Sequence, residues 1–263
     1  MNFDLPGLPD RCDKPRDNGL TMMMDKGLSI RQVEDTLSAS HQYIDIAKLG
    51  FGTSMITNNL QQKLDLYKAA EVRTCFGGTL FEIFYAKGLF DDYRKLIDKY
   101  DMPLVEVSDG SISMKHEDKC ECISMLAEQT VVLSEVGSKD ADNIIPPYKW
   151  IQLIETELEA GAWKVIGEAR EGGNVGLFRS TGEVRSGLVE EILNTISGEK
   201  IMWEAPIKAQ QVWFIKLLGA NVNLGNIAPN EIIPLETLRV GLRGDTFDMF
   251  MDEKVKNKVN SNL

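Results

Sequence analysis

Histidine is scarce in this chain, and its cysteines lack the spacing of a metal site. Among 263 residues there are two histidines, His41 and His116, and neither follows an apolar run of strand length. Ser-His-Asp and Cys-His catalysis therefore has little support, because both need a histidine base beside the nucleophile. Of the four cysteines, Cys120 and Cys122 are too closely spaced for a C-x-x-C site. We expect all four to be reduced thiols without a metal.

Positive charge and long apolar runs are also scarce. The chain has 29 Lys and Arg against 40 Asp and Glu, a net charge of −11, which argues against a nucleic-acid partner. No apolar run approaches the roughly 20 residues that a membrane span needs. Residues 1–19 lack the apolar stretch of a signal peptide. We therefore expect a cytoplasmic protein with no nucleic-acid or membrane partner.

Eight apolar runs of strand length recur along the chain, each ending in a polar residue and usually a glycine. They span residues 20–27, 43–52, 71–78, 103–110, 130–137, 163–170, 200–206 and 220–226. Between them lie amphipathic stretches such as 29–40, 91–100 and 148–162, with apolar residues at three- and four-residue spacing. Eight strand–helix units predict an α/β fold: a single (β/α)8 TIM barrel with a parallel eight-stranded core.

The length alone also allows two smaller domains, and an open doubly wound sheet is the rival fold. Such a sheet usually carries a glycine fingerprint after its first strand, whereas the G-x-G of this chain, "GFGTS" at 50–54, follows the second run. The barrel is therefore favoured. We place it at residues 18–247, with an N-terminal arm at 1–17 and a polar C-terminal tail at 248–263.

Side-chain alternation predicts which polar residues share the inside of the barrel. In this fold the outer face of each strand meets helices, so polar side chains belong on the inner face near the carboxyl-terminal rim. On the sixth run Ile166, Glu168 and Arg170 share one face. The same parity over all runs predicts a mouth lined by Lys48, Glu106, Glu135, Glu168, Arg170, Glu204 and Asn223. The alternative is a web of salt bridges at the barrel rim.

The carboxylates of this mouth would repel one another unless they are protonated, paired with lysine or arginine, or bound to a cation. An oxygen-rich, histidine-poor site favours Mg²⁺ over Zn²⁺. The predicted ligands are two or three of Glu106, Glu135, Glu168 and Glu204. Asp25 and Asp109 are second choices, for which capping of a glycine turn is the alternative.

Three glycine turns could bind phosphate through backbone N–H groups. They are "GFGTS" with Gly52 and Thr53, "FGGT" (76–79) with Gly78, and "NLGNI" (223–227) with Asn223 and Asn226. Each is weak evidence alone, since glycine turns end barrel strands in any case.

Successive motifs of the chain resemble those of the phosphosulfolactate synthases, in order, over roughly residues 18 to 247. The motifs are "DKG" (25–27), "KLGFGTS" (48–54), "GGTLFE" (77–82), "EVSDG" (106–110), "EVG" (135–137), "EAREGG" (168–173), "EAP" (204–206), "QQV" (210–212), "VNLGNI" (222–227) and "ETLRVGLRGDT" (236–246). The resemblance implies a (β/α)8 barrel that adds sulfite to phosphoenolpyruvate in a Mg²⁺-dependent step. The product would be (2R)-2-phospho-3-sulfolactate, an early intermediate of coenzyme M biosynthesis.

The implied reaction assigns roles to individual residues. Mg²⁺ would withdraw electrons from the substrate carboxylate so that sulfite can attack the neighbouring alkene, and a general acid would then protonate carbon. Candidate acids are Lys139 and Lys48, and Lys139 is favoured because Lys48 is better placed to pair with carboxylates. Both substrates are anions, so we expect a local cationic patch with Arg170 first. Arg239 and Arg243 could reach the same mouth, or form salt bridges that close the last helix onto the barrel.

Two other functions stay open at this stage. Relatives of these enzymes include proteins tied to stress tolerance, so the chain could be a non-catalytic member. It could also be a different lyase that handles phosphoenolpyruvate or a sulfonate. The retained charges at Glu135, Lys139, Glu168 and Arg170 favour an enzyme. We expect a carbon–sulfur lyase that forms a homo-oligomer.

Overall fold

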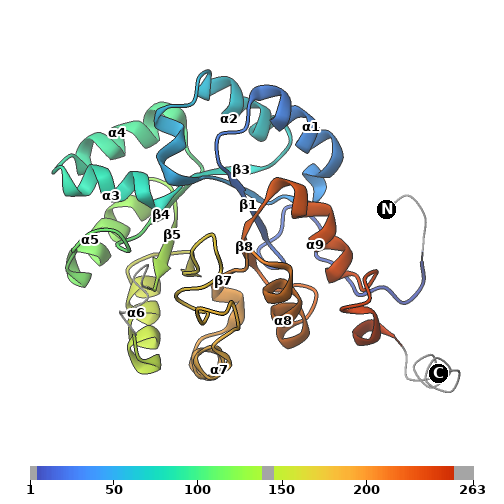
Figure 1. The fold of residues 1–263 in the computed structure, drawn as a ribbon. Helices are drawn as coiled ribbons and strands as arrows, with labels where there is room; N and C mark the ends of the chain where they lie inside the picture. Colours follow the sequence, from blue (N-terminus) through green and yellow to red (C-terminus); the bar gives the residue numbers. More distant parts are fainter. Residues whose placement is uncertain (1–4, 138–144, 252–263) are drawn as a thin grey trace, which may run out of the picture.

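A computed structural model of the chain describes residues 5–137 and 145–251. Its strands form one closed barrel in which every strand is parallel to its neighbours, and β8 pairs with β1 (Figure 1). The strands are β1 Thr21–Asp25, β2 Ile46–Leu49, β3 Arg73–Phe76, β4 Leu104–Val107, β5 Val131–Val136, β6 Lys164–Gly167, β7 Ile201–Glu204 and β8 Leu224–Ile227. The predicted (β/α)8 barrel is confirmed, and the open sheet is wrong.

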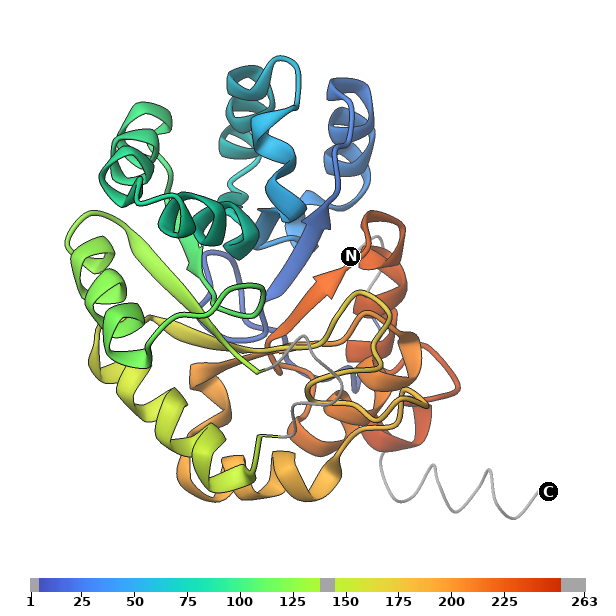
Figure 2. The ribbon, with the colours of Figure 1, turned by 60° about the vertical axis from the view of Figure 1, so that its left-hand side comes forward.

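Helices surround the strands as a ring (Figure 2). The α-helices are α1 Ile30–Ser40, α2 Leu60–Ala69, α3 Gly78–Ala86, α4 Phe90–Tyr100, α5 His116–Ala127, α6 Pro147–Glu159, α7 Ser186–Thr195, α8 Lys208–Leu218 and α9 Ile232–Arg239. Short 3-10 turns complete the connections: η1 His41–Tyr43, η2 Gly50–Met55, η3 Gly198–Lys200, η4 Pro229–Glu231 and η5 Phe247–Phe250. In the described part of the chain, no helix is long and apolar enough to cross a membrane.

The barrel interior is filled by one apolar layer below the mouth. Its buried members come from all strands except β8, with Leu20 just before β1: Leu20, Met22, Ile46, Cys75, Leu104, Leu133, Ile166 and Met202. Strand β8 contributes Gly225, where a Cβ would lie 2.7 Å from Met22 Cε. These inward residues alternate with outward ones that pack on the helices, as a small barrel requires. The layer separates the two ends of the barrel.

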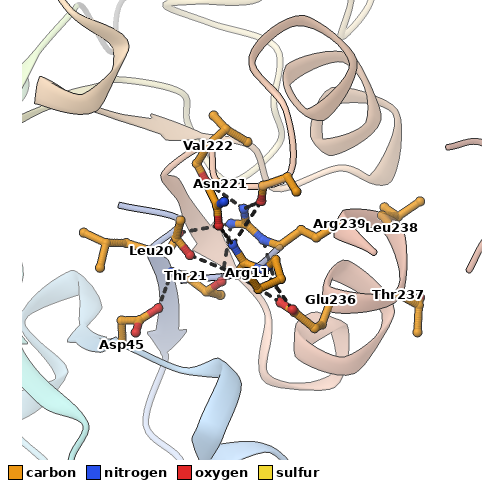
Figure 3. A network of polar contacts seen from close by, with 12 residues as sticks. Arg11, Leu20, Thr21, Asp45, Asn221, Val222, Glu236, Thr237, Leu238 and Arg239 are labelled. Carbon is orange, nitrogen blue, oxygen red and sulfur yellow. Dashed lines mark hydrogen bonds and ion pairs between the residues drawn. The ribbon is translucent and has the colours of Figure 1, made fainter. Parts of the chain in front are cut away.

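The amino-terminal end of the barrel is held by two arginines (Figure 3). Arg239, at the end of α9, is fully buried and donates to the carbonyl oxygens of Leu20, Ala220 and Val222. Arg11 forms a bidentate pair with Glu236, at 2.9 and 3.2 Å. The predicted arm therefore contributes contacts to the floor of the barrel. Of the predicted tail, residues 252–263 lie outside the described residues.

Candidate functional site at the barrel mouth

A cavity of about 360 Å³ opens at the carboxyl ends of the strands. The residues that line it come from the carboxyl ends of the eight strands or from the loops that follow them. Its charged and amide side chains are Lys48, Glu106, Glu135, Glu168, Arg170, Glu171, Asn174, Glu204 and Asn226. The predicted mouth is therefore a real cavity, and six of the seven predicted residues line it.

Lys48 lies in the middle of the mouth and is shared by two carboxylates. Its Nζ is 2.8 Å from Glu106 Oε2 and 3.0 Å from Glu204 Oε1. Burial alone would lower the pKa of Lys48, but Glu106, Glu204 and Glu135 outweigh it and raise the pKa well above the ordinary value. Lys48 is therefore a buried counter-ion, and its raised pKa makes it a poor proton donor near neutral pH.

Three buried glutamates converge beside this lysine. One carboxylate oxygen from each of Glu135, Glu168 and Glu204 lies within 4.8 Å of the others. Burial, together with Glu135 and Glu106, raises the pKa of Glu204 to about 7, although Lys48 opposes the shift. Glu106 is engaged elsewhere, since its second oxygen accepts a hydrogen bond of 2.8 Å from the backbone N–H of Gly78. Of the four predicted ligands, the structure thus brings three together.

Local sequence explains how these side chains reach one point. The glutamates stand at the inward positions of β4, β5 and β7 and just after β6, so strand alternation aims them at the axis. Gly137 follows β5 with φ +142°, and a Cβ there would lie 2.5 Å from Glu168 Cβ. A larger residue would push β5 and β6 apart at this point. Glycine is therefore needed to keep Glu135 and Glu168 close.

Some of the predicted anion-binding groups line the cavity, and others do not. Arg170 is exposed, lines the cavity, and has no ion-pair partner among the described residues. Asn226 also lines it, with φ +61° and its Nδ2 donating to Ala169 O. Gly78 lines the cavity, but its N–H is taken by Glu106. In η2 the lining residues are Gly50 and Phe51, whereas Gly52 and Thr53 are not among them.

Three other residues predicted to bind substrate do not line this cavity. Asn223 faces inward but lies before β8, where its side chain bonds Leu20 N and Ile201 O at the amino-terminal end. Arg239 is buried in the same end. Arg243 lines a separate cavity beside Lys208. For Arg239 the alternative, closing the last helix onto the barrel, is the one the structure supports.

The second-choice metal ligands are already satisfied by protein groups. Asp25 is fully buried and accepts hydrogen bonds from the N–H groups of Gly27 and Leu28, from Lys63 Nζ and from Tyr67 Oη. It caps the turn after β1, as the alternative predicted. Asp109 pairs with Lys119 at 2.9 Å and does not line the cavity. The favoured acid, Lys139, lies outside the described residues.

Sequence reasoning missed the buried lysines that support the mouth from helices. Lys119 is 1% exposed and donates to Asp109, to Glu157 and to the main-chain oxygen of Glu135. Lys63 holds Asp25 in the same way. The available signal was a lysine among apolar residues of an amphipathic helix, which places a cation on the face that packs on the barrel.

Two findings place the chain among known proteins. A closed (β/α)8 barrel with buried carboxylates at the carboxyl ends of its strands has the architecture of a barrel enzyme, since the active sites of such enzymes lie at this end. The chain belongs to the (2R)-phospho-3-sulfolactate synthase (ComA) family, which matches residues 9–245. The match begins inside the predicted arm and covers the whole barrel.

Individual relatives agree with this family. The chain is 42% identical to a phosphosulfolactate synthase of Methanocaldococcus jannaschii, over 87% of this chain and 94% of the relative. It is 38% identical to a phosphosulfolactate synthase of Bacillus subtilis, over 91% and 96%. A solved structure of 3-keto-L-gulonate-6-phosphate decarboxylase from Vibrio cholerae aligns with a TM-score of 0.54, at 9% identity, over 89% and 98%. That likeness concerns the fold alone.

Proposed function

We propose that this protein is a Mg²⁺-dependent lyase that adds sulfite to phosphoenolpyruvate and forms (2R)-2-phospho-3-sulfolactate. The observation that carries the proposal is the convergence of Glu135, Glu168 and Glu204 in the cavity, in a chain of the phosphosulfolactate synthase family. The family and its relatives support a synthase of phosphosulfolactate, and the cavity has a charge and size that suit a small anion bound beside a cation.

The donor set fits Mg²⁺. All three side chains offer carboxylate oxygens, the ligands that this hard cation prefers. One oxygen from each of Glu135, Glu168 and Glu204 lies within 4.8 Å of the others, so these three residues would together hold the cation. When bound, Mg²⁺ would supply Lewis-acid polarisation of the substrate carboxylate and would relieve repulsion among the glutamates.

The protein groups around this centre have separable tasks. Lys48 holds Glu106 and Glu204 in place. Arg170 offers a planar fork at the rim, suited to bidentate contact with a phosphate or sulfonate. Asn226 adds an amide at the same rim. Protonation of carbon after sulfite attack still needs an acid, for which Lys139 remains our prediction.

The test is a reconstitution followed by NMR. Purified protein is incubated with phosphoenolpyruvate, sulfite and Mg²⁺, and the appearance of a new sulfonate is followed while each component is left out in turn. Product that requires all three components supports the proposal. Consumption of phosphoenolpyruvate with Mg²⁺ alone would indicate another lyase, and no turnover under any condition would indicate a non-catalytic relative. A Glu168→Gln variant controls for contaminating activity.

A further inference from the structure

The connection from β6 to α7, residues 168–185, is drawn in yellow in Figure 2. It forms part of the wall of the mouth. It contains no helix or strand, and one isolated bridge joins Phe178 to Val184. Four of its members after Ala169 line the cavity: Arg170, Glu171, Gly172 and Asn174. The position of this loop therefore decides where the exposed guanidinium of Arg170 points.

One side chain joins the two halves of this loop. Gln210, in the first turn of α8, is 1% exposed, and its Nε2 donates to Gly173 O at 2.8 Å and to Gly182 O at 3.1 Å. Its Oε1 accepts from Ile207 N at 3.3 Å, which fixes the orientation of the amide. A side-chain amide has two N–H donors, and both are used on the loop.

The loop backbone is fitted closely to this amide. Gly173 has φ +61°, and a Cβ at this position would lie 2.6 Å from Gln210 Nε2. Gly182 also has positive φ, at +84°. Both carbonyl acceptors thus belong to glycines in the left-handed region, where other residues are disfavoured. Close approach and backbone conformation together specify a contact rather than a chance neighbour.

We propose that Gln210 is a positioning residue that holds the β6–α7 loop so that Arg170 and Asn174 face the substrate. Gln210 does not line the cavity, so it acts through the loop and does not touch the substrate. The inference rests on the proposed function in taking an anionic substrate to bind at Arg170. The hydrogen bonds from Gln210 to Gly173 O and Gly182 O, which we call the brace, are however a property of the folded chain that can be measured without turnover.

Loss of the brace should weaken binding more than chemistry. Without Gln210 the buried carbonyl of Gly173 and the partly buried carbonyl of Gly182 lose this donor, and opening of the loop would let water replace it. If only about a tenth of the molecules keep the binding-competent loop, the apparent dissociation constant rises about tenfold. Glu135 and Glu204 stand on strands, and Glu168 directly follows β6 with its N–H bonded to Val136 O at 3.0 Å, so kcat should change little.

The first experiment compares Gln210→Met with the wild type in limited trypsin digestion. The loop offers cleavage after Arg170, Arg179 and Arg185. We expect these sites to be cut about tenfold faster in the variant, with the rest of the chain still protected. Gln129→Met is the matched control, because Gln129 also donates to a carbonyl, that of Arg94, but far from the mouth. Unchanged loop cleavage in Gln210→Met would overturn the proposal, as would acceleration spread evenly over the chain.

The second experiment uses steady-state kinetics with phosphoenolpyruvate. We expect Gln210→Met to raise KM about tenfold with kcat within about threefold. An unchanged KM in an active enzyme refutes the positioning role alone, whereas an inactive wild type with a loosened Gln210→Met loop refutes the proposed function and leaves the brace. Should Gln210→Met fail to fold, Gly173→Ala disturbs the same contact from the loop side and should give the same cleavage pattern. Normal loop protection in Gly173→Ala would then overturn the brace.

Discussion

The two ends of the barrel both contain buried charges, but they treat them differently. At the amino-terminal end, Arg239 is fully buried and bonds three main-chain carbonyls, and Arg11 and Glu236 neutralise each other. At the mouth, five glutamates line the cavity, and in the described part of the chain the cationic residues that line it with them are Lys48 and Arg170. At the floor each of these charges has partner groups, whereas the described residues of the mouth carry an excess of negative charge.

This difference separates structural charges from those of a binding site. Burial lowers the pKa of Arg239 to about 9, which still leaves it cationic at neutral pH among its acceptors. Burial raises the pKa of Glu204 to about 7, so the charged form of this carboxylate is disfavoured in the mouth. A buried charge with matched partners stabilises one conformation, while converging like charges are tolerated where a ligand is to bind.

The same criterion works within one end of the molecule. Asp25 ends β1 close to the mouth, yet it accepts hydrogen bonds from Lys63, Tyr67 and two backbone N–H groups. Glu135, Glu168 and Glu204 line the cavity, and one carboxylate oxygen from each lies within 4.8 Å of the others. We therefore assign Asp25 to the scaffold and the glutamates to the site, although all four are buried carboxylates at strand ends.

The largest expected effect is the loss of activity when a glutamate of the mouth is substituted. Glu135→Gln and Glu168→Gln each keep the shape of the side chain but remove a charged ligand, so we expect kcat/KM to fall at least about 100-fold. Stability should stay the same or rise, because like charges repel in the buried site. Titration of activity with Mg²⁺ and thermal unfolding measure both. Wild-type Mg²⁺ dependence in both variants would refute the assignment.

The floor should show the opposite response. Arg239→Met removes the fully buried guanidinium that donates to the carbonyls of Leu20, Ala220 and Val222, so we expect the free energy of unfolding to fall by about 3 kcal/mol or more. The remaining folded enzyme should have a normal kcat. Urea unfolding measures the loss, and Arg243→Met, from the same sequence motif, should change stability by about 0.5 kcal/mol at most. A kinetic defect with normal stability in Arg239→Met would place it back in the substrate site.

A smaller effect is expected at the rim. Arg170→Lys keeps the charge but removes the fork, so KM for phosphoenolpyruvate should rise about tenfold while the melting temperature stays the same. Arg179→Lys is the control, because Arg179 lies in the same loop with its side chain 66% exposed. Unchanged kinetics with a lowered melting temperature in Arg170→Lys would make Arg170 a structural residue.

The inward glutamates could be predicted because strand alternation is a local geometric property. Once the eight runs are taken as barrel strands, a period of two residues places Glu106, Glu135, Glu168 and Glu204 on the inner face, and all four line the cavity. Their role as metal ligands stays a prediction. Closure of the barrel, which the run count predicted, is what brings residues about 100 positions apart in sequence to one point.

Alternation gives the face of a strand but not the height along it. Asn223 has the inward parity that was predicted, yet β8 begins at Leu224, so Asn223 lies below the apolar layer. Strand boundaries are the least certain part of such a prediction. Lys63 and Asp25 are 38 residues apart in sequence, and their pairing depends on how α2 packs on β1. No local sequence pattern encodes that packing.

The smallest expected effect concerns Arg11, which ties the arm to the floor. Its pair with Glu236 is bidentate, and the two side chains are 11% and 10% exposed. Since both side chains keep some exposure to solvent, Arg11→Ala should lower the free energy of unfolding by about 1 kcal/mol. A double-mutant cycle with Glu236→Gln should return part of that value as coupling, because Arg11 also donates to Gly19 O and Ala220 O. Because the apolar layer lies between the floor and the mouth, KM and kcat should not change in either variant. A loss of activity without a loss of stability would show that the two ends communicate, and the floor could then no longer be regarded as scaffold alone.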